Sequence, residues 1–412
     1  MYHDIVSLQA LKLLDSDNTN PDNKKKTMKN IYLDYNSNTP CDIKVIDSMN
    51  AIWSQPGNPH SVGHSFGWCK EILIRDALET FAELYDCFED ELLFTSGATE
   101  ANNLAIYAGI KVAKSLKPQA NTILTSHLEH KSVLAPLERA SKNNGLKLIY
   151  VDINSDGTLN LESLEEQLSN NEVLWVSCAI TNGIIGTNQP INKVSALCKN
   201  FDALLHVDAA QAGYLPISCI DLDIDFLTLS AHKIYGPSGI GLLYSKHLKS
   251  PEFIPMIIGG GQQDGLRSGT LATPLIVGFQ KAAELMAENR DVEIQSLRQL
   301  RQTLHDGLNK VLDIEVIGDI NNRHPGNLYL SIANVDSMQL LNNVQPKLAF
   351  SLGSACDGLN REYAPLMKAL GISKQKAETT FRICVGRMTT EAEVIQATDM
   401  LIENVQRLKP AR

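Results

Sequence analysis

The sequence of 412 residues lacks the marks of several specialised protein classes. It has no apolar run long enough to cross a bilayer, and its N-terminus lacks the basic start, apolar core and cleavage site of a secretory signal. A net charge of −10 argues against a general nucleic-acid or anionic-membrane binder. We therefore expect a cytoplasmic protein with neither nucleic acid nor a membrane as a direct partner.

Metal-binding cysteine patterns are missing as well. None of the eight cysteines falls in a Cys-x-x-Cys or Cys/His spacing, so the sequence predicts no metal site. We interpret seven of them as small buried hydrophobes. Cys356 differs because it lies among small residues at 351–358, where an exposed and mobile thiol can act as a nucleophile. An incidental surface cysteine fits the same setting.

The organisation of the chain follows from its apolar residues. Residues 15–27 have no aliphatic or aromatic side chain, so we interpret 1–29 as a polar, mobile N-terminal extension. From about residue 65, helical spacing alternates with short apolar runs, which predicts an α/β fold with a mostly parallel sheet. The expected strands are 122–126, 147–151, 173–179, 203–207, 226–229 and 240–244, followed by a long helix over about 281–312 and weaker strands near 328–333 and 347–352. We assign 43–291 to a large domain, and 30–42 with 292–412 to a smaller α+β domain that carries the cysteine loop.

Polar residues follow the apolar run 92–94 and four of the expected strands. They are the segment 95–100, His130, Asn182, Asp208 and Lys233. Ligands of open α/β sheets bind at the carboxyl ends of the strands. A lysine at one strand end and an acid at another are what a pyridoxal phosphate enzyme needs, because the amine binds the aldehyde and the carboxylate keeps the pyridine nitrogen protonated. Lys233 and Asp208 are therefore the first candidates.

Phosphate-binding groups are expected near these two residues. Residues 96–100 open a helix whose free N–H groups suit a phosphate, although an ordinary capping segment has the same pattern. Ser230 and His232 flank Lys233 and can supply further donors. The glycine-rich segment 259–270 allows close approach to a ligand or another subunit, and it lacks the strand context of a P-loop.

Three further candidates each have a plain alternative. His130 can stack on a flat ring and move protons as a catalytic residue, or it is an ordinary surface or core histidine. Gln211 can donate to a phenolate oxygen, or it faces solvent in a turn. Arg382 can clamp a substrate carboxylate, or it makes a surface ion pair.

Together these residues resemble the cysteine desulfurase family, the class V aminotransferase branch of the fold-type I pyridoxal phosphate enzymes. The resemblance covers about residues 31–408 and rests on many motifs in one order. The matching stretches are 32–35, 57–61, 95–100, 129–131, 206–209, 230–237, 267–270 and 353–356.

The resemblance implies a homodimer that converts L-cysteine to L-alanine and passes the sulfur, as a persulfide on Cys356, to an unidentified acceptor protein, as in iron–sulfur cluster assembly. Lys233 would hold the cofactor and move protons, and Arg382 would hold the substrate carboxylate. The implied cofactor contacts are Asp208 at the pyridine nitrogen, Gln211 at the phenolate oxygen, His130 on the ring, and Ala98, Thr99, Ser230, His232 and the partner subunit's Thr270 at the phosphate.

One stretch departs from the family pattern. The family reads Asn-Asn-Glu-x-Gly where this sequence has residues 182–186, and Gly183 takes the place of an Asn that touches both cofactor and substrate. Two alternatives therefore stay open: a related lyase or transaminase acting on another amino acid, such as selenocysteine, or a weak homologue kept as a sulfur-relay subunit.

Overall fold

The computed structural model describes residues 30–352 and 365–408. Ile31 begins a compact unit that runs to the C-terminus. The extension predicted for 1–29 and the loop with Cys356 lie outside the described residues. None of the helices in the described ranges combines the length and apolarity needed to cross a membrane.

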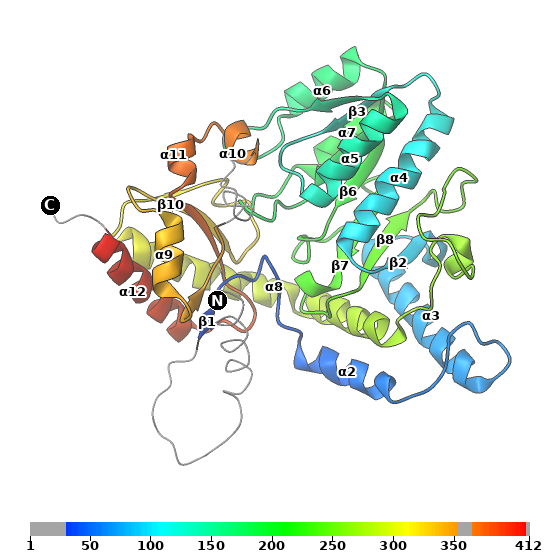
Figure 1. The fold of residues 1–412 in the computed structure, drawn as a ribbon, viewed down its shortest axis with the longest axis horizontal. Helices are drawn as coiled ribbons and strands as arrows, with labels where there is room; N and C mark the ends of the chain where they lie inside the picture. Colours follow the sequence, from blue (N-terminus) through cyan, green and yellow to red (C-terminus); the bar gives the residue numbers. More distant parts are fainter. Residues whose placement is uncertain (1–29, 353–364, 409–412) are drawn as a thin grey trace, which may run out of the picture. The chain divides into compact units, whose positions relative to one another are not determined.

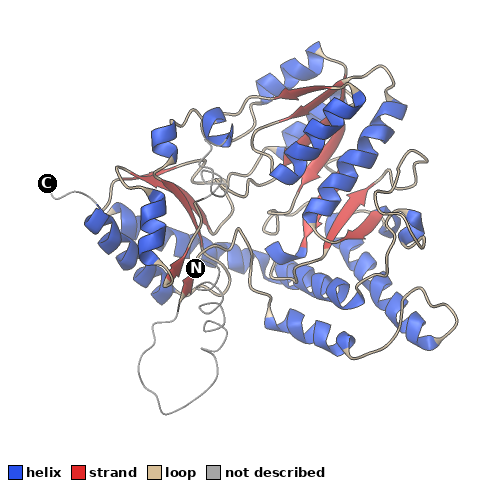
Figure 2. Ribbon diagram, in the orientation of Figure 1, coloured by secondary structure: helices blue, strands red, loops and turns tan. Residues whose placement is uncertain are grey.

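A seven-stranded sheet forms the centre of this unit, with strand order β2-β8-β7-β6-β5-β3-β4. Its strands are β2 Leu92–Thr95, β3 Thr122–Thr125, β4 Lys147–Tyr150, β5 Val173–Ala179, β6 Leu204–Asp208, β7 Phe226–Ser230 and β8 Gly241–Ser245. Only β8 runs antiparallel to its neighbours, so the prediction of a mostly parallel α/β sheet is confirmed. The strands read as continuous apolar runs because helices cover both faces of the sheet (Figure 2).

Two hydrophobic clusters lie on the two faces of the large sheet. One contains α4 and α5, and the other contains α3, α6, α7 and α8. The helix bounds are α2 Ile43–Trp53, α3 Ser65–Tyr85, α4 Ala98–Leu116, α5 Lys131–Asn144, α6 Leu161–Asn170, α7 Ile191–Asn200 and α8 Thr273–Asn309. Helix α4 lies very close to the sheet, because a Cβ atom on Gly109 would fall 2.4 Å from Trp175 and 2.8 Å from Phe226.

The rest of the unit contains a second sheet, in the order β12-β10-β9. Its strands are β9 Ile314–Val316, β10 Asn327–Ile332 and β12 Thr380–Cys384, and its helices are α9 Ser337–Val344, α10 Pro365–Ala369, α11 Lys374–Ala377 and α12 Glu391–Leu408. The N-terminal strand β1 Ile31–Tyr32 pairs in parallel with β11 Leu348–Ala349. Helix α8 packs against α2 and α3 and also against α12 and β10 (Figure 1).

Several sequence expectations need correction here. Helix α8 begins at Thr273 rather than near 281, with a proline in its first turn, a position that suits helix initiation. The boundary between 291 and 292 falls inside this continuous helix, and the division into two domains stays a prediction. Among the described cysteines, four are buried and two are half-buried, but Cys69 is exposed on α3, so its assignment as a buried hydrophobe was wrong.

Candidate functional site

Lys233 and Asp208 lie at the carboxyl ends of adjacent parallel strands. Asp208 is the last residue of β6, and Lys233 ends a short 3₁₀ helix, Ala231–Lys233, that follows β7. The Lys233 amine donates hydrogen bonds of 2.6 Å to the backbone carbonyls of Asn36 and of Ser37. The sequence therefore placed both residues correctly, and it missed the N-terminal segment that holds the amine.

The surroundings of Lys233 favour its neutral form. Burial and, to a lesser extent, the positive charge of Arg382 together lower the pKa of the amine to about 8, against the opposing charges of Asp34 and Asp208. A lysine in this state is a nucleophile near neutral pH, which is what binding an aldehyde requires.

A buried hydrogen-bond network holds the Asp208 carboxylate. Asn102 donates to Asp208 Oδ2 at 2.8 Å, and the Ala210 N–H donates to Oδ1 at 3.0 Å. Asn102 also donates to Ser132 Oγ at 2.9 Å, and that hydroxyl lies 2.7 Å from His130 Nδ1. The imidazole of His130, at the exposed N-cap of α5, is thus tied to Asp208.

Asn102 and Ser132 were missed by the sequence reasoning. The available signal was a polar side chain on the apolar face of α4: Asn102 is fully buried between Ala101 and Leu104. A buried amide on such a face needs a hydrogen-bond partner, which here is the carboxylate.

The first turn of α4 is open to an anion. Its N-cap, Gly97, provides no side-chain hydrogen bond, and Ser96 uses its own N–H to bind the Glu100 carboxylate. The ordinary capping segment is therefore not formed. A Cβ on Gly241 would lie 2.7 Å from Gly97, and Gly241 pairs with Ser230, so β7 ends beside the helix start that carries Ala98 and Thr99.

His232 and Thr270, both expected at the phosphate, differ in their surroundings. Burial, followed by the charge of Lys233, lowers the pKa of His232 to about 4, so its imidazole is neutral at pH 7. Thr270 is exposed. Its loop is anchored to α4 because Arg267 donates two hydrogen bonds to Glu100, at 2.8 and 3.2 Å.

Arg382 and Gln211 are both engaged inside the protein. Arg382 in β12 is 7% exposed; it donates to Asp34 at 2.6 Å and to the Gly183 carbonyl at 2.7 Å. The plain alternative of a surface ion pair is therefore wrong. Gln211 exchanges two hydrogen bonds with Asn36, so it is not a turn residue that faces solvent.

Asn182 does not replace the side chain missing at Gly183. It is buried, donates to the Leu128 carbonyl at 2.6 Å and accepts from the N–H groups of Ile184 and Ile185 at 2.8 and 2.9 Å. Its amide is occupied in shaping the backbone of the loop.

Glu129 is a second buried acid near Asp208. Its Oε1 accepts the Ala179 N–H at 3.0 Å, while Oε2 is buried without a hydrogen-bond partner among the described residues. Burial, and to a lesser extent the charge of Asp208, raises the pKa of Glu129 to about 8. Glu129 is therefore mostly neutral at pH 7.

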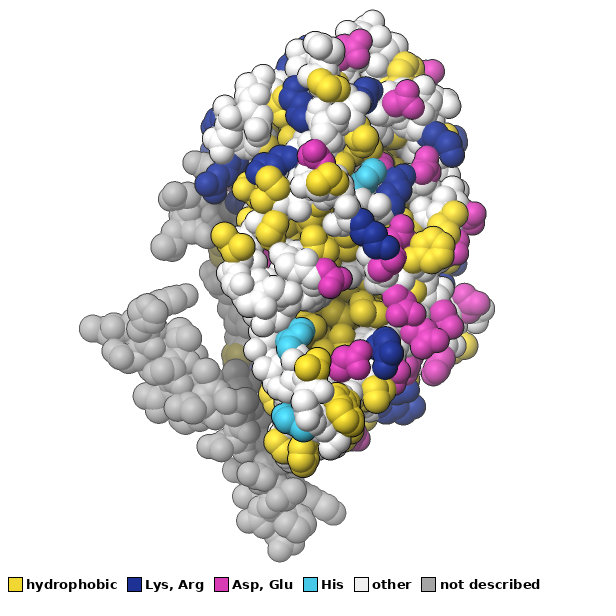
Figure 3. Space-filling view, turned by 90° about the vertical axis from the view of Figure 1, so that its right-hand side faces the viewer, with side chains coloured by type: hydrophobic (Ala, Val, Ile, Leu, Met, Phe, Trp, Pro, Cys, Tyr) yellow, Lys and Arg dark blue, Asp and Glu magenta, His cyan; other side chains and the backbone are white. Residues whose placement is uncertain are grey.

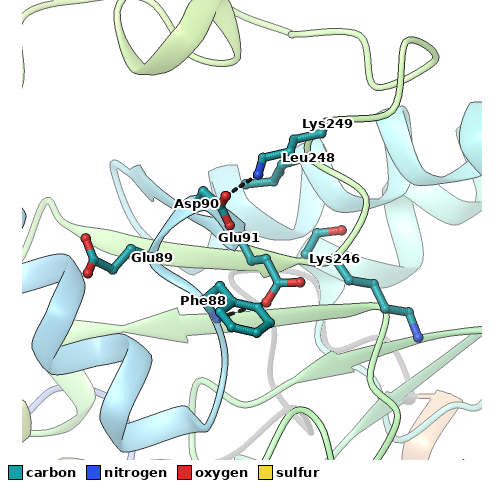
Figure 4. A pocket seen from close by; sticks show the side chains of 8 residues that line it. Phe88, Glu89, Asp90, Glu91, Lys246, Leu248 and Lys249 are labelled. Carbon is teal, nitrogen blue, oxygen red and sulfur yellow. Dashed lines mark hydrogen bonds and ion pairs between the residues drawn. The ribbon is translucent and has the colours of Figure 1, made fainter.

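A hollow of about 550 Å³ lies away from these residues (Figure 4). It is lined by residues 88–91, which include the 3₁₀ helix η1 Glu89–Glu91, and by Ser245, Lys246, Leu248 and Lys249. These residues precede β2 and follow β8, so the hollow is at the edge of the sheet opposite the carboxyl ends of the parallel strands. We assign it no part in the chemistry.

The residues at the carboxyl edge fit pyridoxal phosphate. A buried carboxylate is available for the pyridine nitrogen, a lysine of lowered pKa for the aldehyde and an uncapped helix start for the phosphate. The chemistry of these donors matches the cofactor group by group.

Comparisons with known proteins agree with this arrangement. Residues 31–396 match the aminotransferase class-V family. The cysteine desulfurase IscS of Ehrlichia chaffeensis is 38% identical over 382 residues, which are 92% of each chain. The mitosomal cysteine desulfurase of Encephalitozoon cuniculi is 37% identical over 92% of this chain and 88% of its own.

Solved structures show the same fold. A NifS-like protein superimposes with a TM-score of 0.83 at 30% identity, covering 92% of this chain and all of its own. A NifS-like protein from Rickettsia africae superimposes with a TM-score of 0.78 at 26% identity, covering 92% of this chain and 99% of its own. The chain therefore belongs to the aminotransferase class-V family and is a pyridoxal phosphate-dependent cysteine desulfurase.

Proposed function

We propose a role for each residue of the site in the desulfuration of L-cysteine. When bound, pyridoxal phosphate supplies an electron sink for the charge that develops at the substrate Cα. Lys233 holds the aldehyde and moves the proton at Cα, and Asp208 keeps the pyridine nitrogen protonated. The adjacency of a lysine of lowered pKa and a hydrogen-bonded carboxylate is the observation that carries the proposal.

The remaining residues bind and orient. His130 covers the ring, and Gln211 donates to the phenolate oxygen. Arg382, already surrounded by polar partners, holds the substrate carboxylate. The phosphate is bound by the first turn of α4 and its neighbours, namely Ala98, Thr99, Ser230, His232 and the partner subunit's Thr270.

Cys356 is proposed as the sulfur acceptor from its sequence setting. Its thiolate bonds to the substrate sulfur while the carbon–sulfur bond breaks and leaves its electron pair on carbon. That carbon takes a proton to give alanine, and the persulfide stays on Cys356 until an acceptor protein removes it. The tethered thiol brings the nucleophile to the substrate without a second diffusional encounter.

The test measures alanine and protein-bound sulfane sulfur together after adding L-cysteine. Borohydride reduction and peptide mapping should locate the cofactor on Lys233. Cys356→Ala should keep the cofactor absorbance but form no persulfide, whereas Cys69→Ala, at the cysteine that is exposed within residues 30–352 and 365–408, should behave as wild type. Persulfide formation by Cys356→Ala rejects the role of that thiol, and an adduct elsewhere rejects the role of Lys233.

A second candidate is activity on a different amino acid. It is favoured by Gly183, which has no side chain to contact a substrate, while the buried Asn182 amide is bonded to Leu128, Ile184 and Ile185. A panel that includes selenocysteine decides: turnover of another amino acid with L-cysteine left unreacted supports this candidate.

We also propose that the protein is a homodimer that works in the cytoplasm. Large apolar side chains are exposed in the stretch that ends α2 and begins α3, namely Trp53 (60%), Val62 (83%), Phe66 (57%), Trp68 (53%) and Ile72 (45%). Figure 3 shows hydrophobic side chains on the face at the right of Figure 1. An apolar surface of this kind is typical of an oligomer interface.

Sedimentation equilibrium tests the dimer. Val62→Asp should shift the protein toward monomer, whereas Val292→Asp, at a valine on α8 that is 72% exposed, should not. A wild-type monomer with full activity contradicts the proposal. Cell fractionation tests the location.

A further inference from the structure

Three amide side chains form a continuous hydrogen-bonded network beside Lys233. Asn327 donates to Asn36 Oδ1 at 2.7 Å and to the Ile184 carbonyl at 3.1 Å. Asn36 donates to Gln211 Oε1 at 3.1 Å, and Gln211 Nε2 donates back to the Asn36 carbonyl at 2.7 Å. Asn36 and Asn327 are 1% and 0% exposed. We refer to Asn327, Asn36 and Gln211 as the amide network.

The amide network fixes which way each amide points. A backbone carbonyl only accepts hydrogen bonds, so the nitrogen of Asn327 must face Ile184 and the nitrogen of Gln211 must face the Asn36 carbonyl. Asn36 Oδ1 accepts from Asn327, so the Asn36 nitrogen faces Gln211 Oε1. The Gln211 side-chain oxygen therefore accepts from Asn36, and one N–H of the Gln211 amide is left to donate to another acceptor.

The network lies where the sequence departs from the family pattern. A Cβ atom built on Gly183 would fall 3.2 Å from Gln211 Nε2, so a side chain at position 183 would contact Gln211 directly. In this protein that contact is missing, and Gln211 is held by Asn36 instead. Space for the network comes from Gly186, where a Cβ would fall 2.3 Å from Asn327 Oδ1.

We propose that Asn36 and Asn327 are positioning residues that keep the Gln211 N–H turned toward the phenolate oxygen of pyridoxal phosphate, in place of the side chain missing at Gly183. The inference rests on the proposed function, because it requires Gln211 beside the cofactor. Without the Asn36 side chain, only the bond to the backbone carbonyl of residue 36 still orients the Gln211 amide, so the amide turns over more readily and presents its oxygen to an anionic acceptor. The hydrogen bond is then lost, and a lost donor raises the pKa of the group that it stabilised as an anion.

The experiment compares Asn327→Ala and Asn36→Ala with Asn327→Leu, which keeps the volume but lacks the amide. Thr398→Val is the matched control, since it removes a buried hydrogen bond of 2.8 Å to Val394 in α12. Each loaded variant is titrated by visible absorbance, melted and assayed. We expect the spectral pH midpoint to rise by about one unit and kcat to fall about tenfold in the network variants. Thr398→Val should change only the melting temperature.

A second-site variant separates positioning from packing. Gly183→Asn adds an amide beside Gln211, and Gly183 does not adopt the left-handed conformation that would forbid a side chain. In the Asn327→Ala background it should restore the spectral midpoint without restoring the melting temperature, which a merely structural role does not predict.

The outcomes that reject the inference are distinct from those that reject the proposed function. An unchanged spectral midpoint in Asn327→Ala and Asn327→Leu, or activity losses that follow the melting temperature alone, overturns the role of the network. Wild-type protein that takes up the cofactor but yields no alanine from L-cysteine overturns the proposed function, whatever the variants do.

Discussion

The lowered pKa of Lys233 determines how fast the cofactor-free protein should capture pyridoxal phosphate. An ordinary lysine has a pKa of 10.5, whereas burial and the charge of Arg382 bring that of Lys233 to about 8. At pH 7 the neutral fraction is then about 300 times that of an exposed lysine. Because only the neutral amine attacks an aldehyde, the capture rate should rise about tenfold per pH unit below 8 and level off above it.

Capture is followed by mixing cofactor-free protein with pyridoxal phosphate from about pH 6 to about pH 11 and recording visible absorbance. Borohydride trapping followed by peptide mapping confirms that the signal reports Lys233, and Lys233→Ala should give no trapped adduct. A rate that keeps rising to a midpoint near 10.5 refutes the reasoning, because it means that the folded protein leaves the amine as hydrated as a free lysine.

The contribution of Arg382 can be separated from that of burial. Arg382→Gln removes the second cause of the lowered pKa, so the capture midpoint should move upward while staying below that of a free lysine. Arg407→Gln, at an exposed arginine paired with Glu403, is the control and should leave the midpoint unchanged. A downward movement in Arg382→Gln contradicts the electrostatic account.

Three further results are expected. Between pH 4.5 and about 8, Glu129 in the folded protein keeps a proton that the unfolded chain has released, so its contribution to the free energy of unfolding falls as pH rises, by at most about 1.4 kcal/mol per pH unit. Glu129→Gln should remove this pH dependence in urea titrations at pH 5 and pH 7.5, and an unchanged dependence contradicts the prediction. Arg382→Gln should raise KM for L-cysteine about ten- to hundredfold in steady-state assays, and an unchanged KM removes it from the substrate site. Asp208→Asn should keep the fold by circular dichroism while kcat falls about a hundredfold, and near-normal kcat refutes its electrostatic role.

The large sheet was predictable because its strands are short apolar runs between turn signals. Strand β5 matches the expected 173–179 residue for residue. In the second sheet, β9 has three residues and β12 includes Arg382, so neither carries an apolar pattern that stands out from its neighbours. Tertiary pairing, rather than local periodicity, makes these segments strands.

The residues of the site were likewise predictable only where local sequence determines their position. Lys233 and Asp208 follow recognisable strands, so their place at one edge could be inferred. Asn36 and Asn327 could not, because they are 291 residues apart and meet only when the N-terminal segment is folded against β10. A hydrogen bond between residues that distant leaves no periodic trace in a sequence.

Gly109 connects the packing of α4 with the phosphate site proposed at the first turn of that helix. It lies eleven residues from the start of α4, or about 16 Å along the helix axis. A methyl group at this position would push α4 away from Trp175, and the resulting tilt of the helix would displace the backbone N–H groups of its first turn. Given the phosphate site proposed at the start of α4, a side chain at Gly109 should weaken phosphate binding without approaching the phosphate.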